Sequence, residues 1–166
     1  MTKKISNNAT EFHVDTRFQQ MARRPGGMSR DEAIARAQGQ IDEVRPDLEA
    51  FLDRELLALN ALMEDALASP GNTRWLKDAN EHTRQLRNIG STIGLELLTH
   101  IADTLCEMFE RIRKGEEHSV ESVKCYVDSL HLARRDEYRY VRPEEVPELT
   151  EGLRQVAEKL RRPTPA

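Results

Sequence analysis

The chain has 166 residues, of which 38% are hydrophobic and 33% are charged, and its formal net charge is -4. This length suits one domain with a buried core. Aromatic residues make up only 5%, too few for a protein that stacks bases, and the negative charge gives no attraction to nucleic acid or anionic membranes. No stretch approaches about 20 consecutive apolar residues, so we expect no membrane span.

Residues 1–27 are predicted to form a mostly irregular N-terminal arm. They are polar, show no sustained apolar period and end in Arg-Arg-Pro-Gly-Gly. They also lack the apolar stretch of a signal peptide, which favours a cytoplasmic location.

The first helix is predicted to begin at Ser29, because Ser29 and Glu32 have the spacing of a capping box. Pro46 is predicted either to separate this helix from a second one or to begin the second helix in its first turn. The second helix is expected to end at Ser69-Pro70-Gly71. Its apolar residues recur at steps of three and four, which predicts one buried face. They are Leu48, Phe51, Leu52, Leu56, Leu59, Leu62, Met63, Ala66 and Leu67.

Four further helices complete the predicted order of elements. A third helix opens near Asn72 or Thr73 and ends at a turn marked by Gly94, and a fourth stops near Gly115. A fifth begins at Ser119. A final helix follows a break between Pro143 and Pro147. The inward-facing residues are expected to be Leu76, Ala79, Thr83, Leu86, Gly90 and Ile93; Leu97, Ile101, Leu105, Met108 and Ile112; Val123, Tyr126, Val127 and Leu130; and Leu149, Leu153, Val156 and Leu160.

Together these patterns predict an all-α protein. No useful stretch alternates with a period of two, and helices with short connections are typical of an antiparallel up-down bundle. We assign the bundle to residues 28–140 and a C-terminal helix and tail to residues 141–166. Cys106 and Cys125 fall within helical patterns and are expected to be buried free thiols.

One long segment resembles a known family. Residues 84–110 have the sequence RQLRNIGSTIGLELLTHIADTLCEMFE. This resembles histidine phosphotransfer domains, especially a bacterial type with the core H-D-L-K-G-x-G-G-T-F-G followed by a helix ending in A-D-S-L-C-x-x-x-E. Residues 126–130, YVDSL, resemble the H-V-D-A-L segment of the same family, and the likeness covers about 31–139. Without a gap, the matching residues are Leu86, Gly90, Thr92, Gly94, Thr99, Ile101, Ala102, Asp103, Leu105, Cys106 and Glu110.

The resemblance implies a four-helix phosphotransfer fold but departs from the family at its reactive residue. The family's phosphorylated histidine falls at Arg84, its lysine at Arg87, and two of its small glycines at Asn88 and Ser91. A guanidinium stays protonated and has no lone pair for attack on phosphorus, although it can bind a carboxylate or phosphoryl group. At 100° per residue, Arg84 lies about 160° around its helix from Leu86, so its face is expected to be exposed.

We therefore expect a non-catalytic signalling protein related to histidine phosphotransfer domains. It would bind a receiver domain of a response regulator, or a sensor histidine kinase, and modulate a two-component phosphorelay. The expected partner-binding residues are Arg84, Arg87, Asn88 and Ser91. Leu95 and Leu98 are candidates for an apolar rim beside them, although one of the two is expected to pack in the core. We expect no enzymatic activity, catalytic residue, metal or cofactor, because no P-loop, zinc-finger spacing or paired Glu-x-x-His motif occurs.

Two alternatives stay open at this point. The chain could be an active phosphocarrier that uses a displaced histidine such as His82, although His82 is rotated by about 200° from Arg84 and is expected to be packed and hydrogen-bonded. It could instead be a structural interaction module, with self-association, that has no part in a phosphorelay.

Overall fold

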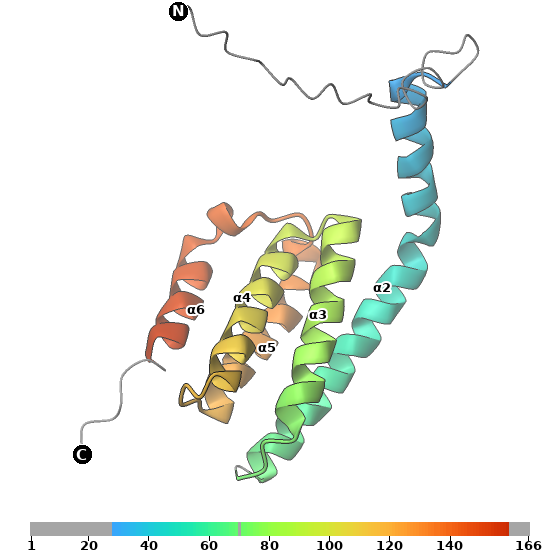
Figure 1. Ribbon diagram of the computed structural model, residues 1–166. Helices are drawn as coiled ribbons and strands as arrows, with labels where there is room; N and C mark the ends of the chain where they lie inside the picture. Colours follow the sequence, from blue (N-terminus) through green and yellow to red (C-terminus); the bar gives the residue numbers. More distant parts are fainter. Residues whose placement is uncertain (1–27, 70, 160–166) are drawn as a thin grey trace, which may run out of the picture. The chain divides into compact units, whose positions relative to one another are not determined.

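The computed structural model describes residues 28–69 and 71–159, and all regular structure in these two ranges is helical (Figure 1). The all-α prediction is therefore confirmed for the described part of the chain. The predicted arm, residues 1–27, and Leu160 lie outside the described residues. None of the helices in the described ranges is long and apolar enough to cross a membrane. The chain divides into two units between Gly39 and Gln40, and the hydrophobic core belongs to the second.

Helix α2, Arg30–Ala68, begins at the predicted capping box. The Ser29 N–H donates to the Glu32 carboxylate at 2.8 Å, and the Glu32 N–H donates to Ser29 Oγ at 3.2 Å. Two N–H groups that have no partner within the helix are satisfied in this way. The bond from the Ser29 N–H is the main cause of a lowered pKa of Glu32, because it stabilises the charged carboxylate.

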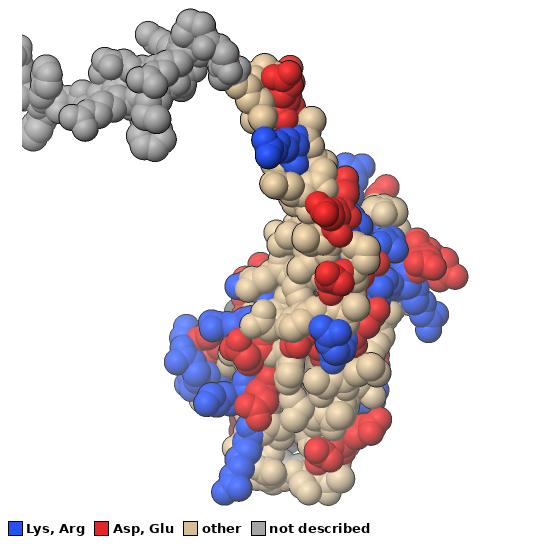
Figure 2. All heavy atoms as spheres, turned by 90° about the vertical axis from the view of Figure 1, so that its right-hand side faces the viewer, with Lys and Arg blue, Asp and Glu red and all other residues tan. Residues whose placement is uncertain are grey.

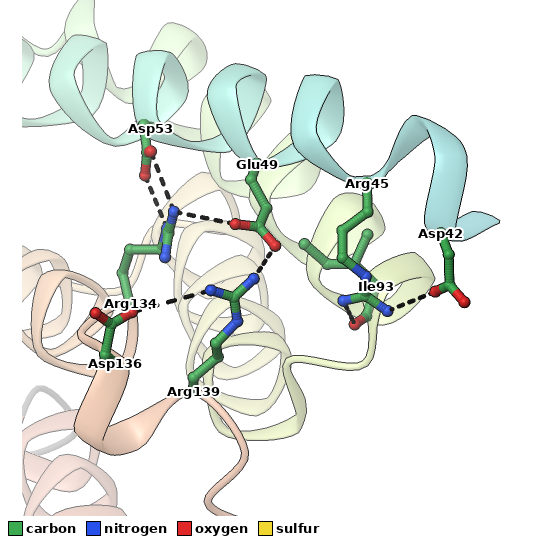
Figure 3. Close-up of polar contacts among 8 residues, drawn as sticks. All are labelled: Asp42, Arg45, Glu49, Asp53, Ile93, Arg134, Asp136 and Arg139. Atoms are coloured by element: carbon green, nitrogen blue, oxygen red, sulfur yellow. Dashed lines mark hydrogen bonds and ion pairs between the residues drawn. The ribbon is translucent and has the colours of Figure 1, made fainter.

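Pro46 lies inside α2, so the predicted division of this helix at Pro46 is wrong. A proline in a helix interior has no N–H to donate and costs about 3 kcal/mol relative to alanine. Tertiary contacts on both sides of the exposed Pro46 ring offset this cost. Before it, Arg45 donates to the backbone oxygen of Ile93 at 2.8 Å, and after it, Glu49 pairs with Arg139 (Figure 3).

Helices α3, Trp75–Ile93, and α4, Glu96–Arg113, form a hairpin around the predicted turn at Gly94. Gly94 has a φ of +78°, a conformation that glycine adopts without strain, and its N–H bonds to the Gly90 oxygen. Gly90 is also the point of close approach between the two helices. A Cβ at this position would lie 2.7 Å from Thr99 Oγ1 and 2.9 Å from Leu98 Cδ2.

The remaining helices begin close to their predicted positions. Helix α5, Val120–Ala133, starts at the predicted cap, where Ser119 Oγ accepts from the Ser122 N–H at 3.1 Å. Two short 3-10 helices, η1 at Asp136–Tyr138 and η2 at Pro143–Glu145, lead to α6, Pro147–Lys159. The Tyr126 hydroxyl donates to the Leu153 oxygen at 2.7 Å and links α5 to α6.

Helices α2, α3, α4, α5 and α6 contribute to one hydrophobic core in the second unit. Most of the predicted inward-facing residues are buried in it. Phe51 and Leu67 are each 37% exposed, which corrects the prediction that they face inward: Phe51 is rotated by about 100° from the fully buried Leu52, and Leu67 lies in the last turn of α2. Cys106 is buried, but Cys125 is exposed, which corrects its predicted burial; both thiols are free.

Candidate functional site

The four predicted partner-binding residues lie along one side of α3. Arg84, Asn88 and Ser91 are exposed and Arg87 is partly exposed, whereas Leu86 is fully buried. Their spacing of three and four residues places them above one another along the helix. The side chain of Arg84 is 50% exposed.

Carboxylates of α4 lie opposite both arginines. Arg87 donates to Asp103 at 3.3 Å, and Arg84 pairs with Glu110 at 3.7 Å. Arg113 also binds Glu110, at 2.5 Å, and this hydrogen bond is the main reason that the pKa of Glu110 is lowered. These pairs are exposed to solvent and therefore weak, so another carboxylate or phosphoryl group can replace the α4 carboxylate at little cost.

The α3–α4 turn could have revealed the pairing of Arg87 with Asp103 in the sequence. In a helical hairpin, residues at similar distances from the turn lie opposite each other. Arg87 and Asp103 are seven and nine residues from Gly94, whereas Arg84 and Glu110 are ten and sixteen residues from it, so this rule indicates only the first pair. Asp103 and Glu110 were not among the predicted partner-binding residues.

A shallow depression runs between the two helices at the level of the arginines. It is lined by Arg84, Arg87, Asp103, Cys106, Glu107, Glu110, Arg111 and Lys114. Cys106 is 6% exposed, and burial raises the pKa of its thiol, although Arg87 and Arg84 oppose this shift. The thiol is therefore held in its protonated, poorly nucleophilic form, and the depression offers charged groups for binding and no activated nucleophile.

A second depression adjoins the first near the α3–α4 turn. Its lining consists of Gly90, Ser91, Gly94, Leu95, Glu96, Thr99, His100 and Asp103. The apolar rim predicted here is wrong, because Leu95 is 2% exposed and Leu98 is fully buried. Both side chains contribute to the core. Polar and small residues therefore form most of the accessible surface beside Ser91.

His82 does not share the face of Arg84. Its Nδ1 lies 2.7 Å from a carboxylate oxygen of Glu55 on α2, which confirms the prediction of a hydrogen-bonded histidine. Two other histidines pack against neighbouring residues. The His118 ring lies 6.2 Å from that of Trp75, and burial lowers the pKa of His131. His100 is exposed on α4, at the second depression.

The described residues contain no group of three or more His, Cys, Asp or Glu side chains that could hold a metal ion. Comparison of the chain with protein-family models, curated proteins and solved structures found no match.

Proposed function

We propose that this protein is a non-catalytic relative of histidine phosphotransfer domains that binds a receiver domain, or a sensor kinase, and modulates a two-component phosphorelay. In this proposal α2, α3, α4 and α5 correspond to the antiparallel four-helix core of that family. The observation that carries it is the position of Arg84: it is exposed on α3, in line with Arg87, Asn88 and Ser91, where the family has its nucleophile.

The chemistry of binding follows from the charges at this face. A receiver domain carries carboxylates around its phosphorylated aspartate. One of these, or the phosphoryl group itself, would take the place of Glu110 or Asp103 and form a bidentate contact with a guanidinium. The present ion pairs are exposed and weak, so this protein loses little free energy when a partner's group replaces Glu110 or Asp103. A partner carboxylate that is desolvated in the complex gains from its contact with the guanidinium.

The surroundings of His82 favour this proposal over an active phosphocarrier. His82 is hydrogen-bonded to Glu55 of α2 and lies off the line of Arg84 and Arg87. A phosphoryl donor to His82 would have to approach from a different side of α3 than the one that carries Arg84 and Arg87. The proposed activity is therefore competition for a receiver, without transfer of the group.

The first test is binding of the full chain to receiver domains from the same cell, measured by calorimetry. Arg84→Ala is expected to weaken the affinity about tenfold, equivalent to about 1.4 kcal/mol, and the loss should be smaller at high salt. Arg135→Ala, which removes an exposed arginine after α5, serves as the matched control and should have no effect. Equal affinities of Arg84→Ala and the unaltered chain, or no binding to any receiver, would contradict the proposal.

The second test restores the family's nucleophile with Arg84→His. If a receiver docks at this face in the family's geometry, the new imidazole takes the phosphoryl group from the receiver's aspartyl phosphate, whose carboxylate leaves. Radiolabel should then appear on this variant, in acid-labile form, and not on the unaltered chain. Label on the unaltered chain that disappears in His82→Ala would instead establish the phosphocarrier.

A further inference from the structure

The two arginines of the α3 face differ in how they contact α4. Arg87 donates a hydrogen bond to Asp103 at 3.3 Å. Arg84 Nη2 lies 3.7 Å from Glu110 Oε1, which is too far for a hydrogen bond. Glu110 therefore satisfies none of the N–H groups of Arg84, and the Arg84 guanidinium keeps these donors for another group.

Glu110 is held instead by Arg113 of its own helix. The Nε and Nη2 groups of Arg113 both donate to Glu110 Oε2, at 3.2 and 2.5 Å. The two residues are three positions apart on α4, a spacing at which a glutamate and an arginine are neighbours on the helix surface. The hydrogen bond from Arg113 is also the largest cause of the lowered pKa of Glu110, whereas Arg84 acts on this carboxyl only through its charge.

Arg84 and Arg113 thus compete for one carboxylate. Figure 2 shows that cationic and anionic side chains lie next to one another on the surface of this protein, so a carboxylate can exchange partners by a small movement. A shift of about 1 Å would bring Glu110 within hydrogen-bond distance of Arg84. Without Arg113, the carboxylate would be free to turn to Arg84 and occupy its donors.

We propose that Arg113 is a positioning residue of the α3 face: it holds Glu110 and thereby keeps the Arg84 guanidinium open for an anionic group of the partner. This inference rests on the proposed function, because Arg84 is the residue to which the partner would bind. Arg113 acts through Glu110 and does not itself contact the partner. Of the two arginines, Arg84 is then the one that a partner carboxylate or phosphoryl group reaches without displacing a hydrogen bond.

The first test needs no partner and uses NMR titration of the Glu110 carboxyl group in the full chain. Arg84→Ala is made in the unaltered chain and in an Arg113→Ala background. In the unaltered chain it should raise the pKa of Glu110 only slightly, because no hydrogen bond is lost. In the Arg113→Ala background the rise should be clearly larger, because Glu110 is then hydrogen-bonded to Arg84.

Lys114→Ala is the matched control background. It removes the same charge from the next residue, and Lys114 acts on Glu110 through its charge alone. Arg84→Ala should therefore have the same small effect there as in the unaltered chain. An equal rise in all backgrounds would overturn the inference, because Arg113 would not be holding Glu110 away from Arg84. A larger rise in Lys114→Ala, matching that in Arg113→Ala, would also overturn it, because charge alone would explain the result.

The second test measures affinity for the receiver domains of the same cell. Arg113→Ala should weaken binding about threefold, the size of effect expected from one exposed ion pair. In a Glu110→Gln background the same change should have no effect, because no carboxylate is released. A loss that persists there would overturn the inference, since Arg113 would then contact the partner itself. If no receiver binds, the proposed function fails, whereas the carboxyl titration still decides whether Arg113 keeps Arg84 open.

Discussion

Gly90 determines how closely α3 and α4 approach each other. A methyl group at this position would lie within 3.0 Å of both Thr99 Oγ1 and Leu98 Cδ2. Neither neighbour moves freely, because Thr99 Oγ1 donates to the Leu95 oxygen and Leu98 is fully buried. Gly90 therefore has a packing role in this chain.

We expect Gly90→Ala to lower the free energy of unfolding by about 1–3 kcal/mol, because overpacking outweighs the better helix propensity of alanine. Urea unfolding would measure the change. Gly152→Ala is the control: Gly152 lies in α6 with nothing within 4 Å of its added Cβ, so this variant should gain about 0.5–1 kcal/mol. A stabilised Gly90→Ala would mean that the two helices do not meet closely at this residue.

Tyr126 makes the stability of the folded protein decrease at alkaline pH. The residue is fully buried, and this burial raises its pKa from 10 to about 12. The folded state thus favours the neutral phenol. The stability that results is complete below pH 10 and is lost as the pH rises from there towards 12.

Tyr126→Phe should therefore be less stable than the unaltered chain at neutral pH, by about 1–2 kcal/mol, because the Leu153 oxygen loses its donor. The difference should shrink as the pH rises above about 10, since only the tyrosine is penalised by ionisation. Unfolding titrations at several pH values would measure it. Tyr140→Phe, at a residue that is 72% exposed, should show neither effect.

At the scale of elements, α2 differs most from the prediction. Local rules place a helix boundary at Pro46, yet the helix continues through it. The contacts that hold the chain on both sides, from Arg45 to Ile93 and from Glu49 to Arg139, join residues that are distant in sequence. These tertiary contacts outweighed the low helix propensity of proline at position 46.

Replacing Pro46 should make this helix more stable. Pro46→Ala restores a backbone donor at an exposed position, and we expect a gain of about 1–2 kcal/mol after allowance for the greater freedom of the unfolded chain. Amide hydrogen exchange around residues 43–49 should slow accordingly. Pro147→Ala should not stabilise the protein, because Pro147 is the first residue of α6, where no N–H is required.

At the scale of the whole molecule, a network of ion pairs connects α2 to the segment after α5 (Figure 3). Arg134 binds Asp53 at 2.8 Å and lies 3.6 Å from Glu49, which also pairs with Arg139. The side chain of Glu49 is only 17% exposed, and those of Arg134 and Arg139 are 20% and 22% exposed. Glu49 is thus the shared, partly buried centre of the network.

Glu49→Gln removes this charge while keeping the shape of the side chain. It should lower the free energy of unfolding by about 1–3 kcal/mol, because two partly buried guanidinium groups lose their shared carboxylate. Asp136→Asn is the comparison: its carboxylate is 94% exposed and 3.9 Å from Arg139, so the change should be negligible. Chemical denaturation of the two variants would distinguish them, and similar stabilities would contradict a central role for Glu49.

The sequence by itself determined the elements whose causes are local. The capping box at Ser29, the cap at Ser119 and the turn at Gly94 depend on residues a few positions apart, and each was correctly predicted. The exposure of Arg84 beside the burial of Leu86 also follows from helical periodicity alone.

Only the tertiary structure decided which residues meet across helices. The continuation of α2 through Pro46, the burial of both Leu95 and Leu98, and the pairing of Arg84 with Glu110 depend on how the helices pack and on their relative register. Periodicity specifies the directions of side chains around one helix but not the neighbour that each will contact. That choice depends on the sum of packing and charge over the whole core, to which residues far apart in the sequence contribute together.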